Sequence, residues 1–324
     1  MRNILFCSVF ISLSWSQLYC QGAEGGAYLF SYFKGNGQDG LHLAGSKDGL
    51  KWTALNNDSS FLMPQIGGKL MRDPSVCSGP DGVFHMVWTT GWWDKGIGIA
   101  HSKDLINWSQ QTFLPVMENE PTAKNCWAPE IFYDEKSQQY LIFWATTIPG
   151  KFPETENPQD DNNHRIYFIS TKDFKQFSDT KLFYEPGFNV IDSFVAFDKK
   201  SDRYVMFLKN ETKHPVVEKN IRIVFGDKAV GPYGKESAPI TGKYWAEGPC
   251  ALEIDGKWFV YFDKYREHRY GAVCSSDLKN WEDVSDKVSF PAGIRHGTAF
   301  KVESRVLTKI TEQTSDSEAD KSGD

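Results

Sequence analysis

Four short segments of this sequence each place one carboxylate at the start of an apolar, β-prone run. The carboxylates are Asp73, Glu130, Asp192 and Glu247, in segments 72–76, 127–131, 190–194 and 245–249. An unpaired carboxylate is costly to bury, so a packed strand gains nothing from starting with one. A single acid of this kind is explained equally well as a turn cap or as the partner of a surface lysine. Four acids at similar intervals predict a shared site, suited to chemistry that needs a proton donor and a proton acceptor.

A weak motif marks a repeat along the chain. It consists of Ser or Thr, one variable residue and Asp, with an aromatic ring four residues after the Asp. Its copies contain Asp48, Asp104, Asp173 and Asp277. A fifth copy has degenerated near Asp227, where Gly231-Pro232-Tyr233 follows. A period of about 50 residues is typical of solenoids, propellers and similar arrays.

The runs within each repeat have the character of strands. Turn residues interrupt them about every 8 to 12 positions, and none keeps an apolar helical period for three turns. Four strands in each of five repeats predict an all-β fold, a five-bladed β-propeller. The first repeat lacks its opening strand. Residues 295–302 are predicted to pair with residues 28–33, which would close the ring and leave no free sheet edge.

The two ends of the chain differ from the repeats. Residues 1–22 contain Arg2 followed by a short apolar run, which is typical of a secretory signal and predicts a secreted or periplasmic protein. A lipid anchor at Cys20 is less favoured, because Leu18-Tyr19 precedes it instead of small residues. Residues 311–324 are almost entirely polar and are predicted to be a disordered tail. The propeller is therefore expected to span residues 23–310.

Composition excludes several classes of protein. No run of eighteen apolar residues follows the signal, so no membrane span is predicted. The net charge of −6 argues against nucleic acid and anionic membranes as partners. Outside residues 1–22, no cysteine belongs to a CxxC or Cys/His cluster, which argues against zinc. These cysteines are predicted to be buried free thiols, with a disulfide as the alternative; they are Cys77, Cys126, Cys250 and Cys274.

Five short motifs follow one another, one in each repeat: Arg-Asp-Pro, Trp-Ala-Pro-Glu, Ile-Asp, Ala-Glu-Gly-Pro and Arg-His-Gly. Each motif alone is weak, whereas five in this order and at this spacing are specific. Over residues 27–303 the chain resembles the five-bladed propellers of glycoside hydrolase family 43. It departs from that family in one respect, because nearly a complete repeat precedes Asp73. A shift in the point of ring closure explains the departure and leaves the order of motifs intact.

The resemblance implies a role for each matching residue. Asp73 matches the general base, Glu247 the general acid, and Asp192 the acid that holds and tunes the proton donor. Glu130 and Trp127 match a segment that lines the sugar pocket. Hydrolysis with inversion needs one protonated and one ionised carboxyl group about 6.5–9.5 Å apart, and opposed inner strands of a propeller can provide that gap. Like-charge repulsion from Asp192 would help to keep Glu247 protonated.

Further residues are expected to contact substrate or metal. His296 matches a histidine deep on the propeller axis, beside a bound calcium or water; the chemistry needs no cofactor, so this calcium would be structural. Trp92, Trp93 and Trp127 are predicted to stack on sugar rings, with packing inside a blade as the alternative for Trp92 and Trp93. Arg222 is predicted to hydrogen-bond sugar hydroxyls, with a structural ion pair as the alternative. The insertion 148–164 is predicted to be a loop that either shapes the pocket or is merely solvated.

The resulting expectation is an inverting glycosidase that removes terminal sugars, foremost α-L-arabinofuranose, from plant polysaccharide side chains. Three alternatives stay open: a β-xylosidase, a β-galactofuranosidase or galactosidase, and a carbohydrate-binding propeller without catalysis. The presence of all three catalytic carboxylates favours the enzyme over the pure binder. The expected partner is a carbohydrate, and the protein is expected to be a monomer.

Overall fold

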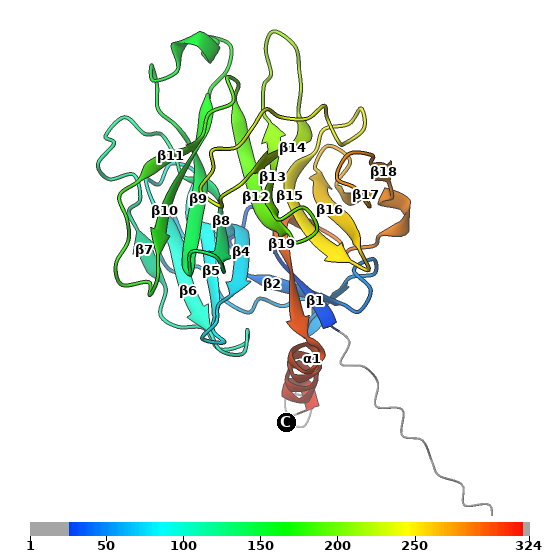
Figure 1. The fold of residues 1–324 in the computed structure, drawn as a ribbon. Helices are drawn as coiled ribbons and strands as arrows, with labels where there is room; N and C mark the ends of the chain where they lie inside the picture. Colours follow the sequence, from blue (N-terminus) through cyan, green and yellow to red (C-terminus); the bar gives the residue numbers. More distant parts are fainter. Residues whose placement is uncertain (1–25, 320–324) are drawn as a thin grey trace, which may run out of the picture.

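The computed structural model describes residues 26–319, which form five antiparallel sheets around a common axis (Figure 1). From the axis outward, blade 1 contains β19 (Ile294–Glu303), β1 (Gly26–Lys34), β2 (His42–Ser46) and β3 (Thr53–Ala54). Blade 2 contains β4 (Arg72–Ser78), β5 (Phe84–Thr89), β6 (Ile97–Ser102) and β7 (Thr112–Leu114). Blade 3 contains β8 (Trp127–Asp134), β9 (Gln139–Thr147), β10 (His164–Thr171) and β11 (Lys181–Tyr184). The predicted secretory signal, residues 1–22, lies outside the described residues.

The remaining two blades complete the ring. Blade 4 contains β12 (Val190–Asp198), β13 (Arg203–Asn210) and β14 (Asn220–Gly226). Blade 5 contains β15 (Glu247–Ile254), β16 (Lys257–Lys264), β17 (Arg269–Ser275) and β18 (Glu282–Asp283). The short 3-10 helices are η1 (Asn56–Asp58), η2 (Pro153–Thr155) and η3 (Ser285–Lys287). Each inner strand contacts the next around the axis, in the order β19, β4, β8, β12, β15. The prediction of an all-β, five-bladed propeller is confirmed.

The two ends of the propeller meet in blade 1. β1 and β19 are antiparallel neighbours, with Tyr28 opposite Lys301 and Ser31 opposite Thr298. The Ser31 hydroxyl also donates to the carbonyl of Pro74, at 2.6 Å, which ties blade 1 to blade 2. The predicted pairing of residues 295–302 with residues 28–33 is therefore confirmed, and it removes the two edges that an open ring would expose.

The repeated Ser/Thr-x-Asp motif forms the turn after the third strand of a blade. In blade 1 the Ser46 hydroxyl accepts the amide of Gly49 at 2.9 Å, and the Asp48 carboxylate accepts the amides of Leu50 and Lys51 at 2.8 and 2.9 Å. The Trp52 indole then donates to the Gly49 carbonyl at 3.1 Å. The Asp side chain thus satisfies the backbone groups of a tight turn, and this local need explains why the motif repeats.

Blade 4 differs from the predicted pattern of four strands. Its outer segment is joined to β14 by backbone hydrogen bonds of Gly234 to Phe225 and of Ile240 to Ile221, each 2.8 Å, but forms no named strand. The degenerate copy of the repeat motif lies just before this segment. Loss of the Ser/Thr-x-Asp turn is consistent with an outer segment that pairs only at intervals.

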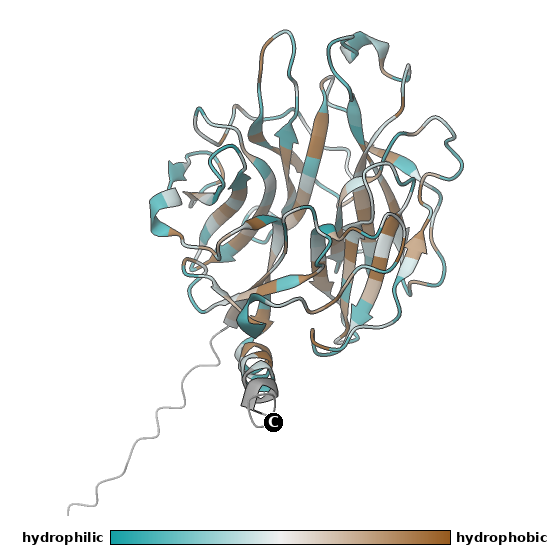
Figure 2. Cartoon of the chain, turned by 180° about the vertical axis from the view of Figure 1, so that it is seen from behind, coloured by the Kyte–Doolittle hydropathy of each residue, from teal (hydrophilic) through white to brown (hydrophobic). Residues whose placement is uncertain are grey.

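Apolar side chains between neighbouring blades form the core. Figure 2 shows hydrophobic residues along the strands and hydrophilic residues on many of the loops. Between blades 1 and 5, the ring of Phe30 meets those of Trp52 and Tyr270 edge-on, at centroid distances of 5.4 and 5.3 Å. Trp52 stacks on Phe290 at 5.7 Å. Such pairs add a modest stabilisation to the large area that aromatic rings bury.

The segment after β19 is helical. Helix α1 (Ser304–Ala319) follows β19 directly, so residues 311–319 are not the disordered tail that their composition predicted. Ile310 is fully buried, and Leu307 packs against the same core as Leu55 and Met86. These contacts start the helix, and the polar residues that follow continue its hydrogen bonding. No helix among the described residues is long and apolar enough to cross a membrane.

The cysteines are free thiols, as predicted. Cys126 and Cys250 are buried, Cys77 and Cys274 are half-buried, and all four are unpaired in the described part of the chain. Burial raises the pKa of the Cys126 and Cys250 thiols well above their ordinary value. Neutral, desolvated thiols of this kind behave as small apolar residues.

Candidate active site

The start of every inner strand lies at one end of the propeller. Antiparallel pairing places Arg72 opposite Thr89 and Glu247 opposite Asp263, so each start lies beside the loop that joins the second and third strands. In Figure 1, two of these loops, residues 148–163 and 211–219, rise on the side away from α1. The strand starts that carry the carboxylates noted in the sequence therefore gather at the mouth opposite the C-terminal helix.

Each inner strand is irregular at the same place. The pairing register shifts between Arg72 and Ser75 in β4, and equivalent shifts occur in β8, β12, β15 and blade 1. The backbone is left-handed at the bulged residue, with φ values of 52° at Asp73, 47° at Ala128, 53° at Asp192 and 59° at Gly248. A bulge redirects the side chain it carries. Here the bulges bring residues from different blades together on the axis.

Three bulge residues form an axial cluster. The Nδ1 atom of His296 lies 3.4 Å from Oδ1 of Asp73 and 4.0 Å from Oδ2 of Asp192. All three side chains are about nine-tenths buried or more. Burial alone would lower the pKa of His296, but the carboxylates of Asp192 and Asp73 raise it above its ordinary value. The cluster joins β4, β12 and β19, and it brings three of the sequence-predicted site residues together.

Hydrogen bonds fix both carboxylates of the cluster. Thr89 donates to Oδ2 of Asp73 at 2.9 Å, and the Gly248 amide donates to Oδ2 of Asp192 at 3.0 Å. A Cβ atom on Gly248 would lie 2.4 Å from the His296 ring, and its backbone is left-handed, so glycine is required there. Burial raises the pKa of Asp192 to about 6; His296 and Lys209 oppose the shift, and Glu247 adds to it.

Glu247 directly precedes Gly248, whose amide donates to Asp192, and its environment differs from that of the buried cluster. Its carboxylate is about one-fifth exposed and contacts two cations, Nζ of Lys209 at 3.0 Å and Nη2 of Arg295 at 3.3 Å. The Arg295 guanidinium also donates to the buried carboxylate of Asp263, at 2.7 Å. Burial, and then the charge of Glu247, raises the pKa of Asp263. Two cations therefore pair with the Glu247 carboxylate at the mouth.

The sequence did not reveal the buried ion pairs behind Glu247. Lys209 is only 3% exposed, and its ammonium lies 2.6 Å from Glu211, which also pairs with Lys219. Burial lowers the pKa of Lys209, but the charges of Glu211 and Glu247 raise it by more. The pKa of Lys209 is therefore well above its ordinary value. The available signal was a run of polar residues, Lys-Asn-Glu, directly after the apolar strand 205–208.

Glu130 does not present its carboxylate to the mouth as predicted. It is 4% exposed and accepts hydrogen bonds from Ser75 at 2.5 Å and from Thr298 at 2.7 Å. Burial raises the pKa of Glu130 to about 7, although both hydroxyls lower it. Glu130 thus joins β4, β8 and β19 within the core, because the bulge at Ala128 turns Trp127, not Glu130, toward the mouth.

Three tryptophans line one side of the mouth. The Trp127 indole donates to the backbone carbonyl of Trp92 at 2.7 Å, and its ring meets those of Trp92 and Trp93 at 5.5 and 5.9 Å. The guanidinium of Arg72 lies 4.3 Å from the centre of the Trp92 ring. Trp92 and Trp93 are 41% and 64% exposed, so packing inside a blade does not account for them.

Arg222 does not belong to this site. It lies on β14, the outermost strand of blade 4, and pairs with Glu218 at 2.8 Å and with Glu236 at 3.9 Å. Its Nε donates to Asn220 at 3.0 Å. The structural ion pair, which the sequence left as an alternative, is the arrangement observed.

The described residues do not by themselves form a metal site. No group of three or more His, Cys, Asp or Glu side chains in the described part of the chain is arranged to hold an ion. His296 faces two carboxylates, and its Nδ1 atom lies at ion-pair distances from both. Calcium beside His296 stays a prediction.

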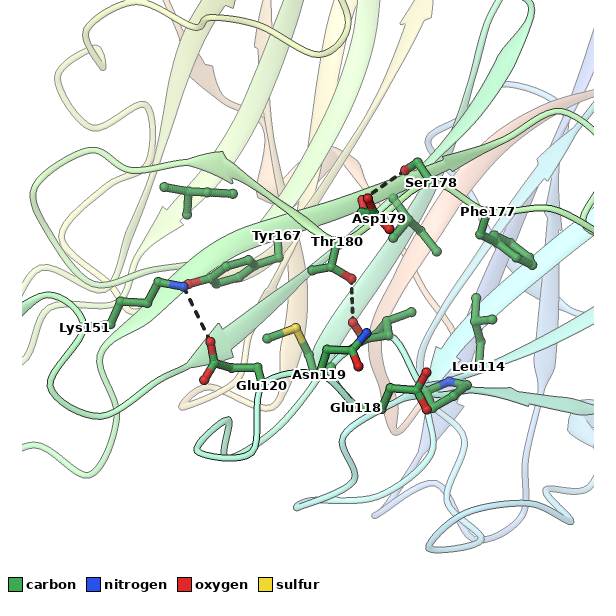
Figure 3. Close-up of a pocket in the computed structure, with 15 residues that line it drawn as sticks. Leu114, Glu118, Asn119, Glu120, Lys151, Tyr167, Phe177, Ser178, Asp179 and Thr180 are labelled. Atoms are coloured by element: carbon green, nitrogen blue, oxygen red, sulfur yellow. Dashed lines mark hydrogen bonds and ion pairs between the residues drawn. The ribbon is translucent and has the colours of Figure 1, made fainter.

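A second hollow lies away from the axis, between blades 2 and 3 (Figure 3). Loop residues 115–120 form one wall, and Tyr167 with residues 177–182 forms the other. Thr180 donates across it to the Val116 carbonyl at 2.6 Å, and Lys151 lies 3.8 Å from Glu120. The residues that line the hollow include none of the axial carboxylates.

Fold and site together define a five-bladed propeller with a buried carboxylate–histidine cluster on its axis. A family model described as "Probable glycosyl hydrolase domain", related to family 43, matches residues 24–306. The chain therefore belongs to the glycoside hydrolase family 43 propellers.

Two curated relatives match shorter parts of the chain. An α-L-arabinofuranosidase of Bifidobacterium longum subsp. longum is 27% identical over 128 residues, 36% of this chain and 12% of the relative. A β-xylosidase of Bacillus subtilis is 28% identical over 92 residues, 26% of this chain and 17% of the relative. The matched parts thus span less than a fifth of either relative.

Solved structures share the fold at low identity. A thermostable family-43 glycoside hydrolase has a TM-score of 0.55 at 15% identity, covering 73% of this chain and 80% of that chain. An α-L-arabinofuranosidase from Lactobacillus brevis has a TM-score of 0.52 at 18% identity, covering 66% and 72%. An exo-β-1,3-galactanase from Phanerochaete chrysosporium, solved with β-1,3-galactotriose, has a TM-score of 0.52 at 12% identity, covering 69% and 52%.

Proposed function

We propose that this protein hydrolyses glycosidic bonds and releases terminal sugars, foremost α-L-arabinofuranosyl residues. The observation that carries the proposal is the bulge repeated in the inner strands, which gathers Asp73, Asp192 and His296 on the axis beside Glu247. Membership in the family and the name of the Bifidobacterium relative support the choice of activity and sugar. A β-xyloside is the second candidate substrate, supported by the name of the Bacillus relative.

In the proposed reaction Asp73 is the base and Glu247 is the acid. Asp73 takes a proton from water as the water oxygen bonds to the anomeric carbon. The bond to the leaving oxygen breaks, and Glu247 gives that oxygen its proton. A single displacement of this kind inverts the anomeric configuration. The buried position of Asp73 and the more open position of Glu247 fit a water below the sugar and a leaving group toward the mouth.

Asp192 acts through other groups in this proposal. Its carboxylate accepts the amide of Gly248, the residue after Glu247, and so holds the backbone that carries the proton donor. The charge of Glu247 also raises the pKa of Asp192, so the two carboxylates interact electrostatically. Asp192 is therefore a positioning and tuning residue.

Mutant kinetics on two leaving groups test the roles of the two acids. Acid and base assistance are each worth roughly 10²–10⁴ in rate, so Asp73→Ala and Glu247→Ala each lose most activity on a natural glycoside. With a nitrophenyl glycoside the leaving group needs little protonation, and Glu247→Ala recovers much of its rate while Asp73→Ala does not. Recovery in Asp73→Ala instead would reverse the assignment.

Proton NMR of the first-formed sugar tests the stereochemistry. Inversion predicts an anomeric configuration opposite to that of the substrate, and azide rescues neither variant through a glycosyl-enzyme. A product that keeps the substrate's configuration would make one of the two acids a nucleophile. A panel of aryl α-L-arabinofuranoside, β-xyloside and β-galactofuranoside identifies the sugar; no turnover of any glycoside would leave the carbohydrate-binding alternative.

The site of action is a separate proposal. Residues 1–22 alone support export, as read from the sequence, and they lie outside the described part of the chain. Export would bring the enzyme to extracellular or periplasmic carbohydrate. Detection of the mature protein in the culture medium or periplasm, with an N-terminus near residue 23, tests this.

A further inference from the structure

A cleft opens at the rim of the mouth. It lies between the β5–β6 loop of blade 2 and the long β9–β10 loop of blade 3, and its lining includes Trp92, Trp93 and Trp127. Asp161 and Asn162 stand on the other wall. Exposed rings gathered in one place mark binding surfaces, whereas scattered apolar residues do not.

The tryptophan wall is held in a fixed arrangement. The indole of Trp127 donates a hydrogen bond to the Trp92 carbonyl, and the Arg72 guanidinium lies over the Trp92 ring at 4.3 Å. The Arg72 guanidinium also lies 4.7 Å from the centre of the Phe33 ring and donates to Asn36, so three contacts hold it in place. Trp93 lies tilted at 45° to Trp127 and keeps most of its surface in solvent. A wall ordered before binding loses little conformational entropy when a ligand arrives.

The opposite wall is anchored as well, although it belongs to a long loop. Asp160 pairs with His214 of the β13–β14 loop at 2.6 Å, which joins the two raised loops of Figure 1. Lys124 donates to the Asp161 carbonyl at 2.7 Å, and Asn189 donates to the Asn162 carbonyl at 2.9 Å. These contacts leave the Asp161 residue exposed, while the side-chain oxygen of Asn162 is buried and has no hydrogen-bond partner among the described residues.

We propose that this cleft binds a sugar residue of the substrate chain other than the one being released. The proposal rests on the proposed function, and it names a rim subsite that makes the enzyme prefer carbohydrate chains to simple glycosides. Flat rings on one wall suit the apolar face of a sugar, and a carboxylate and an amide on the other suit its hydroxyls. Arg72 links the cleft to the axial cluster, because its guanidinium contacts the Trp92 ring and it directly precedes Asp73 in β4.

Trp93→Ala is the direct test. The probes are a nitrophenyl glycoside and a soluble polysaccharide that carries the same terminal sugar, chosen as a pair that the unaltered enzyme hydrolyses. We expect kcat/KM on the polysaccharide to fall at least about tenfold more than kcat/KM on the nitrophenyl glycoside, chiefly through KM. Phe113→Ala is the matched control, since Phe113 is a 37% exposed ring on β7, in the same blade but outside the cleft. It should change neither value.

A double-mutant cycle sharpens the test. If Trp93 and Asp161 hold the same sugar from opposite walls, Trp93→Ala combined with Asp161→Ala loses less than the two single losses added together. Equal loss on both substrates, no loss on the polysaccharide, or strict additivity overturns the subsite.

Binding separates this proposal from the proposed function. Retardation of the protein by soluble polysaccharide in a native gel needs no turnover, so it is measured in the Asp73→Asn background. Retardation that Trp93→Ala abolishes supports the subsite even if no glycoside is hydrolysed. Retardation that survives the change, or no retardation of the parent protein, overturns it while leaving the catalytic assignment to the kinetic tests.

Discussion

Two consecutive positions, repeated around the axis, build the site. The bulged position supplies Asp73, Asp192 and His296 to the buried cluster, and it is filled by Ala128 and Gly248 in the other two blades. The position before it supplies Arg72, Trp127, Glu247 and Arg295 to the more open mouth. Asp tolerates the left-handed backbone better than most side chains, which suits it to the bulge. The chemistry thus follows from which residue type occupies each copy of one local structure.

Opposite charges around Glu247 predict opposite shifts in the pH–rate profile. Asp192→Asn removes a negative charge beside the proposed proton donor, so the basic limb of the profile is expected to move to lower pH. Lys209→Met removes a cation 3.0 Å from Glu247, the proposed proton donor, so the basic limb is expected to move to higher pH. Initial rates across the pH range, measured as kcat on a substrate with a poor leaving group, report both shifts.

A buried lysine outside the site provides the control for Lys209. Lys264 is 4% exposed and pairs with Glu267 at 3.0 Å, so Lys264→Met removes a comparable charge without touching Glu247. Its basic limb should stay in place. Shifts of the same sign in Asp192→Asn and Lys209→Met would mean that a group other than Glu247 sets this limb.

Sequence reasoning found the axial residues but not their surroundings. Asp73, Asp192, Glu247 and His296 were predictable because each stands in a short motif at a strand start. The burial of Glu130 was not, because a bulge one position earlier changes which side of the strand a residue occupies. The role of Lys209 was not predictable, because a lysine buried against two carboxylates has no local sequence pattern. Its partners come from β15 and from the loop after β13.

At the level of elements, strands were easier to predict than the chain's end. The alternation of turns and apolar runs predicted the blades. The strand missing from the first repeat predicted the pairing of β19 with β1. Helix α1 was missed because residues 311–319 were judged by their own composition. Their helix is continuous with a preceding turn that buries Ile310, so its stability comes from residues outside the polar stretch.

C-terminal truncation separates the contributions of β19 and α1. A chain ending at Glu303 loses α1 and the burial of Leu307 and Ile310, which we expect to lower the free energy of unfolding by about 2–5 kcal/mol. A chain ending at Gly293 also loses β19, His296 and the closure of the ring, and it should aggregate because β1 and β4 lose their neighbour. Size-exclusion chromatography and urea unfolding distinguish the two.

A single substitution controls for the length of the truncated chain. Ile310→Ala should account for most of the loss seen on removing α1, whereas Thr308→Ala, on the exposed side of the helix, should have little effect. A chain ending at Gly293 that stays monomeric and folded would show that β19 is not needed for ring closure.

At the scale of the whole molecule, the propeller is held partly by a buried acid on its axis. Glu130 lies on β8 and accepts hydrogen bonds from hydroxyl groups of β4 and β19, so its carboxyl group links three blades. Burial raises the pKa of this group from 4.5 to about 7. The folded molecule therefore keeps a proton at pH values where the unfolded chain has released it.

This difference predicts how Glu130 affects stability across pH. Below an unfolded-state pKa near 4.5 both states are protonated, and the contribution of the neutral acid to folding is fully present. As pH rises, the unfolded chain releases this proton first, while the folded state keeps it until the pH passes about 7. The contribution of Glu130 to stability is therefore lost as pH rises through about 7. The full span is on the order of 3 kcal/mol.

Glu130→Gln removes the titration while keeping the shape of the side chain. An amide can accept one hydroxyl and donate to the other, so the links to Ser75 and Thr298 survive. Urea unfolding at about pH 5 and about pH 8 should show that the variant loses less stability with rising pH than the parent. Glu253→Gln, at an exposed position on β15, is the matched control and should leave the parent's dependence unchanged. If Glu130→Gln keeps the full dependence, the proton released on unfolding belongs to another axial group, of which Asp192, with a pKa raised to about 6, is the first to examine.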